Sequence, residues 1–277
     1  MKQKPENSLD IHDLAGLEKN PGKWFEENVS RLRQNRKVQA GFASTGDGRK
    51  IFIKRYLLPW FWDRLALWLY SDKAGTQFRI SSLLIEAGIN VPSPLAIYRD
   101  LAGSPPSVLY MCEALNSCHS LRSAIHDLKE TDSQEIPSLM AYVAEMIARM
   151  HAMGVVHGDF KWGNILIAPG PGFDIWFVDL DNACPMDFPG KNRYALDLAR
   201  FAVDMAMYLP YPKIFAAFIH CYADNTGLNA ADIIRAMVPF FKRRCRKNLQ
   251  KKHKITSPAW LSTLAAEVID KESLKIK

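Results

Sequence analysis

At 277 residues, with 48% hydrophobic and 23% charged side chains, the chain has the composition of a water-soluble globular protein. The polar first residues predict no secretory signal, and the most apolar region, residues 56–70, falls short of the roughly 20 apolar residues that cross a bilayer. The net charge of +7 favours anionic partners, and five cysteines without a CxxC pair favour free thiols in the cytosol over a zinc site.

The first part of the chain is predicted to be rich in strands. Residues 1–30 are expected to form a polar lead-in with one short helix. Residues 71–88, SDKAGTQFRISSLLIEAG, have helical periodicity and end at Gly88, a residue suited to a helix C-terminus. Alternating apolar residues and turn signals such as TGDG predict four strands. These strands are expected at residues 37–44, 49–56, 91–100 and 107–115.

The remainder is predicted to be rich in helices. A short helix is expected at residues 120–128 and a long amphipathic helix at about 138–151, and everything from about Tyr194 onward is expected to be helical. Two short strands, NILIA and DIWFVDL, lie between them. This order predicts an α+β protein of two lobes: a small lobe at residues 1–112 with an N-terminal extension, and a large lobe at residues 113–277 with a basic C-terminal segment.

The octet HGDFKWGN, residues 157–164, gathers polar side chains between the long helix and a strand. Phosphoryl transfer needs a carboxylate to orient and deprotonate the attacking hydroxyl, oxygen ligands for Mg²⁺, and a lysine on the nucleotide phosphates. Each of these residues alone is compatible with an ordinary turn or strand edge. The ordered set, however, predicts a phosphotransferase, and its members are Lys54, Asp159, Asn164 and Asp179.

HGDFKWGN and the later VDLD resemble the catalytic loop and metal-binding motif of the protein-kinase-like fold, usually HRDxKxxN and DFG. Gly158 in place of the arginine is similar to small-molecule and atypical kinases. Residues 48–205 as a whole, including IKRY, the helix ending at Gly88, HAMGVVHGDFKWGNILI and FVDLDNA, resemble the bacterial lipopolysaccharide kinases. These enzymes phosphorylate inner-core sugars of the outer-membrane glycolipid.

The resemblance implies a bilobal kinase that uses ATP and Mg²⁺ to phosphorylate a heptose or Kdo hydroxyl of the lipopolysaccharide inner core. Residues 1–112 would then bind the nucleotide, and residues 113–277 would carry out the catalysis. Asp159 is implied as the catalytic base and Lys161 as the lysine on the γ-phosphate. The other implied roles are metal ligation by Asn164 and Asp179, phosphate binding by Lys54, and adenine hydrogen bonds from the hinge at Glu113 and Leu115.

The chain departs from the kinase pattern in three places. No glycine-rich loop precedes Lys54. The acid that usually pairs with this lysine is missing, and counting back from Gly88 places Gln77 nearest to that position, which leaves a catalytically dead binding module as an alternative. Asp181 replaces the glycine of DFG, and we expect it to be a surface acid rather than a further metal ligand. The resemblance also implies that Asp197 supports the catalytic loop structurally.

Two further segments bear on partners. The run FKRRCRKNLQKKHK, residues 241–254, attracts lipid head groups or an acidic protein such as a carrier protein, or else forms a solvated helix face. No nucleic-acid-reading motif accompanies it, so no nucleic acid is expected. The aromatic residues of 56–70 suit a membrane interface or a packed helix. Both segments favour a cytoplasmic kinase peripheral to the membrane; the alternatives are a kinase for an antibiotic-type small molecule or for a protein.

Overall fold

The computed structural model describes residues 14, 16–34, 37–58, 73–130, 134–170, 172–185 and 193–250. Contacts divide the chain into two units, Met1–Ile85 with Val91–Asn116, and Glu86–Asn90 with Ser117–Lys277. The first unit is built on a sheet and the second mainly on helices, which confirms the predicted α+β class. Over these described ranges, no helix is both long enough and apolar enough to span a membrane.

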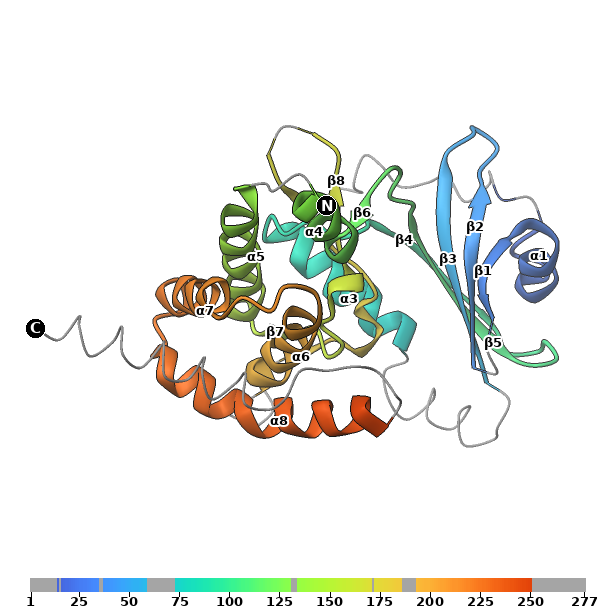
Figure 1. The fold of residues 1–277 in the computed structure, drawn as a ribbon. Helices are drawn as coiled ribbons and strands as arrows, with labels where there is room; N and C mark the ends of the chain where they lie inside the picture. The colour runs from blue at the N-terminus through green and yellow to red at the C-terminus, as the bar shows by residue number, and fades with distance from the viewer. Residues whose placement is uncertain are drawn as a thin grey trace, which may run out of the picture. The chain divides into compact units, whose positions relative to one another are not determined.

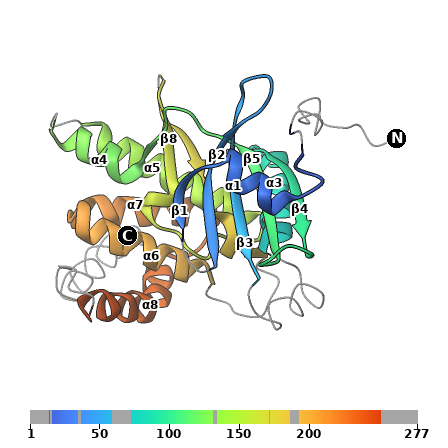
Figure 2. The same cartoon turned by 90° about the vertical axis from the view of Figure 1, so that its right-hand side faces the viewer.

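The first unit contains a five-stranded antiparallel sheet in the order β1-β2-β3-β5-β4 (Figure 2). The strands are β1 (Ser30–Gln34), β2 (Val38–Ser44), β3 (Lys50–Leu57), β4 (Pro94–Asp100) and β5 (Ser107–Glu113). The helices are α1 (Pro21–Asn28) and α3 (Lys73–Glu86). β1 was not predicted from the sequence, because an edge strand needs no apolar alternation: its Leu32 is 66% exposed.

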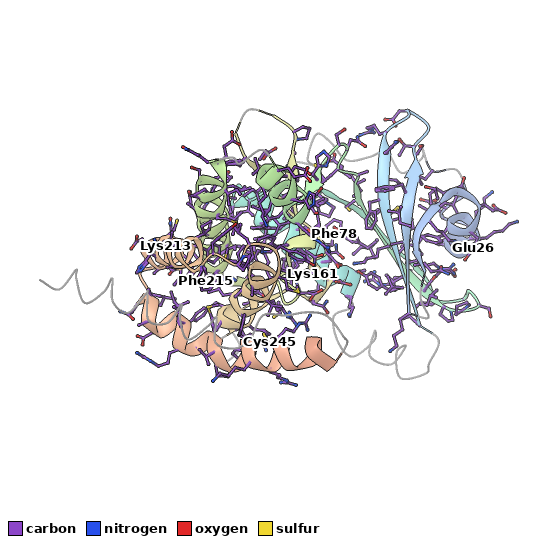
Figure 3. The ribbon with its side chains drawn as sticks, viewed as in Figure 1. Glu26, Phe78, Lys161, Lys213, Phe215 and Cys245 are labelled. Carbon is purple, nitrogen blue, oxygen red and sulfur yellow. The ribbon has the colours of Figure 1, made fainter. Side chains whose placement is uncertain are left out.

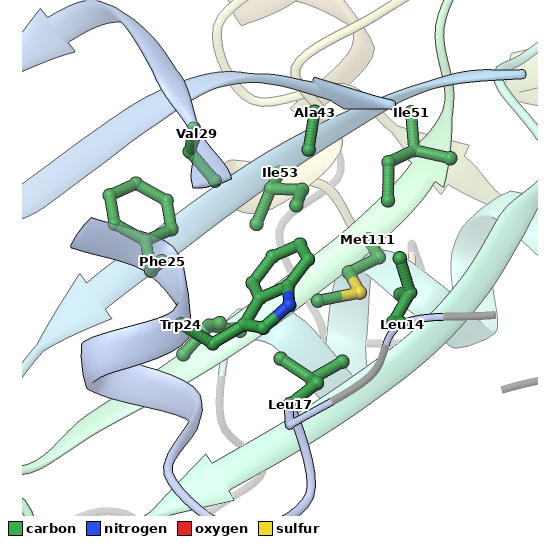
Figure 4. Packing of buried hydrophobic residues seen from close by; sticks show 10 residues of the cluster. Leu14, Leu17, Trp24, Phe25, Val29, Ala43, Ile51, Ile53 and Met111 are labelled. Atoms are coloured by element: carbon green, nitrogen blue, oxygen red, sulfur yellow. The ribbon is translucent and has the colours of Figure 1, made fainter. Parts of the chain in front are cut away.

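The two faces of this sheet are covered by different helices, because successive side chains in a strand point to opposite faces. One face packs on α1 and the segment before it, through Leu17, Trp24, Phe25, Ile51, Ile53 and Met111 (Figure 4). The opposite face packs on α3, through Tyr56, Ala74, Phe78, Val108, Tyr110 and Cys112. Lys54 lies two residues before Tyr56 and therefore belongs to the α3 face.

Arg55, the neighbour of Lys54, points to the α1 face and holds α1 on the sheet. Its buried guanidinium donates to Glu26 at 2.8 Å and to Ser107 Oγ at 3.0 Å, and lies 5.7 Å from the ring centroid of Phe25. Loss of water around the guanidinium lowers the pKa of Arg55, while the nearby Asp100 carboxylate raises it. The adjacent basic residues of β3 thus point to opposite faces of the sheet: Lys54 to the α3 face and Arg55 to the α1 face. Arg55 is a structural residue.

The second unit is mainly helical (Figure 1). Helix α5 packs on α7, and α6 packs on α8. The helices are α4 (Leu121–Glu130), α5 (Glu135–Ala152), α6 (Arg193–Tyr208), α7 (Pro212–Thr226) and α8 (Ala230–Gln250). Two small sheets join β6 (His119–Ser120), β8 (Ile165–Ala168) and β9 (Asp174–Phe177), and pair β7 (Val155–Val156) with β10 (Cys184–Pro185).

The predicted elements that fall on described residues were found with shifts of a few residues. Gly88 follows α3 with a φ of +69°, the left-handed conformation expected just after a helix. The aromatic stretch from Trp60 to Tyr70 lies outside the described residues. So does the basic run beyond residue 250, and within that run side chains are described only for residues 241–245.

We predict that Gly41→Ala destabilises the first unit. Gly41 lies in β2 between β1 and β3, where a Cβ atom would meet the backbone carbonyl oxygen of Ser30 and the side chain of Val29. Because that oxygen belongs to a paired strand, relief requires a backbone shift, and the free energy of unfolding should fall by about 1–3 kcal/mol. Urea unfolding measures this change.

Gly163→Ala is the matched control, because a Cβ atom at Gly163 meets no atom within 4 Å. Equal unfolding midpoints for Gly41→Ala and Gly163→Ala would contradict the tight approach of β1 to β2.

Candidate active site

The octet 157–164 is anchored by its two aromatic residues. Phe160 and Trp162 are fully buried, and their rings lie 5.4 Å from Phe177 and 5.7 Å from Phe201, respectively. Asp159 and Lys161, which alternate with them in the sequence, retain side-chain exposures of 24% and 45%. The alternation of buried rings and polar side chains therefore places the polar groups at the surface of a rigid core.

Asp197 of α6 holds the backbone at the start of the octet. Its carboxylate has no solvent exposure, and its two oxygens accept hydrogen bonds from the amides of His157 at 2.7 Å and Gly158 at 3.0 Å. The structural role predicted for Asp197 is confirmed.

Gly158 meets a conformational and a steric requirement at once. Its φ of +78° lies in the left-handed region that side chains disfavour, and a Cβ atom would meet the backbone carbonyl oxygen of Asn182. The close approach of residues 158 and 182 explains why this position holds glycine.

His157 and Asn164 connect the octet to the segment that carries Asp179. The Nε2 atom of His157 lies 3.0 Å from the carbonyl oxygen of Val178, and its Nδ1 accepts the amide of Asp159 at 3.4 Å. An imidazole with its proton on Nε2 satisfies both contacts. The amide of Val178 also donates to the carbonyl oxygen of Asn164 at 3.0 Å. Asp179 therefore follows a residue that is bonded twice to the octet.

Within the octet, the polar side chains lie close together. Lys161 Nζ, labelled in Figure 3, lies 3.1 Å from Asp159 Oδ2. The buried Asn164 donates from Nδ2 to the carbonyl oxygen of Asp159 at 2.9 Å. This bond fixes the amide group and directs its oxygen away from the backbone of Asp159. The structure thus brings together Asp159, Lys161 and Asn164 in the second unit.

Asp179 has an unusual backbone conformation, with φ 65° and ψ 51°. Aspartate is among the few residues other than glycine that occupy this region, and such residues are concentrated at functional sites. Among the described residues, no cluster of three or more His, Cys, Asp or Glu side chains could hold a metal.

The other four predicted site residues belong to the first unit. Lys54 is 8% exposed, and its Nζ lies 5.9 Å from the ring centroid of Tyr56. Gln77 of α3 is also buried, and its Oε1 accepts the Tyr56 hydroxyl at 3.1 Å. Tyr110, the cross-strand partner of Lys54, also interacts with Gln77. Gln77 therefore faces the part of the sheet that carries Lys54, as the count from Gly88 predicted.

Glu113 is the last residue of β5, and Leu115 lies two residues further on. The amide of Glu113 donates to Ser93 at 3.0 Å, and that of Ala114 donates to Lys50 at 3.2 Å. The amide of Leu115 has no backbone acceptor within the described ranges. Of these three amides, Leu115 is therefore the one available to a ligand.

Asp204 is a supporting residue that sequence reasoning missed. Its carboxylate accepts the amide of Trp162 at 2.7 Å. Burial raises the pKa of Asp204, against that hydrogen bond and the charges of Lys161, Arg122 and Arg244, which lower it. The available signal was its spacing: Asp204 lies seven residues after Asp197 and therefore on the same face of the helix.

The chain is similar to two kinds of curated proteins. It is 31% identical over 127 residues to the 3-deoxy-D-manno-octulosonic acid kinase of Vibrio vulnificus (strain CMCP6), which covers 46% of this chain and 51% of that protein. It is 27% identical over 116 residues, 39% of each chain, to the EKC/KEOPS complex subunit BUD32 of Cryptococcus neoformans var. neoformans serotype D (strain JEC21). The chain thus spans about half the length, or less, of these relatives.

A solved structure described as WaaP in complex with acyl carrier protein has a TM-score of 0.63, with 20% identity over 82% of this chain and 92% of that one. This likeness confirms the predicted kinase-like fold. Residues 15–222 match the model of the Lipopolysaccharide kinase (Kdo/WaaP) family, which accounts for most of the chain. The chain therefore belongs to the lipopolysaccharide kinase (Kdo/WaaP) family.

Proposed function

We propose that the chain is an ATP-dependent kinase that phosphorylates a sugar hydroxyl, of heptose or Kdo, in the lipopolysaccharide inner core. Family membership and the name of the Vibrio vulnificus relative support this reaction. The observation that carries the proposal is the geometry of the octet. There, the amine of Lys161 contacts the carboxylate of Asp159, and the amide of Asn164 donates to the carbonyl oxygen of Asp159. Asp197 of α6 holds the backbone of the same loop in place.

In the proposed mechanism, the carboxylate of Asp159 orients the acceptor hydroxyl and takes its proton. The hydroxyl oxygen then bonds to the γ-phosphorus of ATP, the bond from that phosphorus to the bridging oxygen breaks, and ADP leaves. Lys161, at 3.1 Å from this carboxylate, contributes a positive charge beside the transferred phosphoryl group. The bonds from His157 and Gly158 to Asp197 restrict the loop before substrate binds, so that little reorganisation is needed during the reaction.

We assign the nucleotide to the first unit as the small lobe, and catalysis to the second unit as the large lobe. Lys54 binds ATP phosphates from the α3 face of the sheet, where Gln77 and Tyr56 form a hydrogen-bonded pair beside it. The amide of Leu115 and the carbonyl of Glu113 are the backbone groups proposed to bond adenine, since the Glu113 amide is already used.

Asn164 and Asp179 fit Mg²⁺ as an amide and a carboxylate oxygen donor. The bond from Asn164 Nδ2 to Asp159 leaves the amide oxygen as the outward group, and Val178 brings the backbone of Asp179 beside Asn164. Mg²⁺ prefers such hard oxygen ligands and completes its shell with water and substrate phosphates, so two protein donors suffice. When bound, Mg²⁺ neutralises charge on the β- and γ-phosphates.

The proposal extends to partners. A solved relative carries an acyl carrier protein, which supports a carrier protein as a partner here as well. The basic residues that follow residue 245 in the sequence, Arg246, Lys247, Lys251, Lys252 and Lys254, supply positive charge for an acidic protein or for the anionic cytoplasmic face of the membrane.

The function is tested by incubating the purified chain with ATP, Mg²⁺ and purified inner-core glycolipid. We expect the mass of the acceptor to increase by one phosphate. Asp159→Asn should fold and bind ATP normally, but turnover should fall roughly 10²–10⁴-fold, because the variant lacks the proton acceptor.

Mass spectrometry of the acceptor and calorimetry with ATP distinguish the outcomes. A wild-type chain that phosphorylates an aminoglycoside or a protein but not the glycolipid would contradict the proposed substrate. Near-normal turnover by Asp159→Asn would remove Asp159 from the mechanism.

We predict that Asp179→Asn abolishes Mg²⁺-dependent nucleotide binding, because the carboxylate is the only negatively charged metal ligand proposed. Asp181→Asn is the matched control, two residues away and expected to be a surface acid. Calorimetric titration with ATP, with and without Mg²⁺, measures the difference. If Asp181→Asn alone lost Mg²⁺-dependent nucleotide binding, Asp181 would be the metal ligand and Asp179 would not.

A further inference from the structure

A small cavity of about 260 Å³ lies between α6 and α8 in the second unit. Figure 1 shows these two helices side by side. The described lining residues are Leu196, Ala199 and Arg200 from α6, and Phe240, Arg243 and Arg244 from α8. Its volume lies just below the roughly 300–1,000 Å³ of pockets for drug-sized ligands, so it suits a single sugar-sized group.

The two helices line the cavity with matching patterns. In each, the lining residues are spaced i, i+3 and i+4, so each set forms one continuous helix face. Each face combines an apolar residue, Leu196 or Phe240, with arginine. Three guanidinium groups therefore surround one cavity next to an apolar wall, whereas the described lining contains no carboxylate.

Arg200 shows that this charge is not fully compensated. Its Nη1 atom is buried and has no hydrogen-bond partner among the described residues. A buried donor of a charged group without a partner is costly, and native proteins usually satisfy such groups with protein, water or ligand. Arg244, by contrast, lies close enough to Asp204 to lower the pKa of that carboxyl. Arg200 has a buried donor that is unpaired within the described part of the chain, and Arg243 is exposed, so these two are the arginines that we assign to an anion.

Helix α6 connects the cavity to the candidate active site. Leu196 and Arg200 flank Asp197, which holds the amides of His157 and Gly158. Asp204, which interacts with Arg244, holds the amide of Trp162 on the other side of the octet. The same helix therefore supports the catalytic loop with one face and lines the cavity with another.

We propose that the cavity between α6 and α8 binds a carboxylate or phosphate group of the acceptor glycolipid. This inference rests on the proposed function. Guanidinium groups form paired hydrogen bonds to both kinds of oxyanion, and the apolar wall suits the carbon face of a sugar ring. The acid named for the Vibrio vulnificus relative is a sugar with a carboxylate. The cavity thus supplies acceptor recognition separately from the groups that perform the transfer.

The test compares Arg200→Gln and Arg243→Gln with Lys242→Gln. Lys242 is exposed, lies on the same helix and does not line the cavity, so its substitution removes the same charge as a matched control. Three acceptors are used: the intact glycolipid, its carboxyl methyl ester and a dephosphorylated form. The KM for acceptor, the KM for ATP and kcat are measured for each pair.

We expect both arginine variants to raise the KM for intact acceptor about tenfold to a hundredfold, the usual contribution of a hydrogen bond to a charged group. The KM for ATP should stay unchanged, and Lys242→Gln should resemble wild type. Wild type should show the same rise with the ester if the anion is a carboxylate, or with the dephosphorylated form if it is a phosphate. On that modified acceptor, the KM of the arginine variants should equal the KM of wild type, because the anion that they would bind is already absent.

An unchanged KM in both variants, or a further loss on each modified acceptor, would overturn the proposal. Arg243 is exposed, so its variant remains informative if Arg200→Gln unfolds. If wild type phosphorylates none of the acceptors, the proposed function fails, and calorimetry with the free sugar acid and with inorganic phosphate decides on the cavity. If wild type binds one of these two anions, and both arginine variants bind it at least tenfold more weakly, the result supports the proposed cavity. If wild type binds neither anion, the result contradicts it.

Discussion

The carboxylate of Asp197 accepts hydrogen bonds from two consecutive amides, those of His157 and Gly158, at a position without solvent exposure. A buried carboxylate is costly unless its oxygens are satisfied, so the interaction favours only loop conformations that bring both amides to it. Residue 158 must then adopt a positive φ against the carbonyl of Asn182, which only glycine tolerates well. The position of Asp159, the next residue, depends on this arrangement.

The support of the loop extends through the helical unit. His151 of α5 lies with Nε2 3.5 Å from the carboxylate of Asp197, and its Nδ1 lies 2.8 Å from the hydroxyl of Tyr222 on α7. Seven residues further along α6, the carboxylate of Asp204 likewise accepts a backbone hydrogen bond from the octet, from the amide of Trp162. The proposed catalytic groups are therefore held from both ends of the octet by one helix, which also lines the arginine cavity.

The sequence indicated the proposed catalytic residues of the octet because their spacing is local: Asp159 and Asn164 lie on one loop, where the structure brings them together. It also placed Gln77 toward Lys54, since helical periodicity counted from Gly88 is reliable over three turns. Asp204 was missed, because its partner, the amide of Trp162, becomes apparent only when the loop is folded against α6. The edge strand β1 and the two-residue strands were missed because their pairing depends on tertiary contacts rather than on apolar alternation.

The most direct measurement of this account is amide hydrogen exchange at His157 and Gly158, together with kcat, in wild type and Asp197→Asn. An asparagine side chain offers one acceptor oxygen and turns an NH₂ group toward the second amide, so the loop loses at least one bond. We predict strong protection of both amides in wild type. In the variant we predict faster exchange at the loop, preserved protection in α5 and α7, and a large fall in kcat. Native protection of both amides, or a wild-type kcat, in the folded variant would contradict the claim that Asp197 positions the catalytic loop.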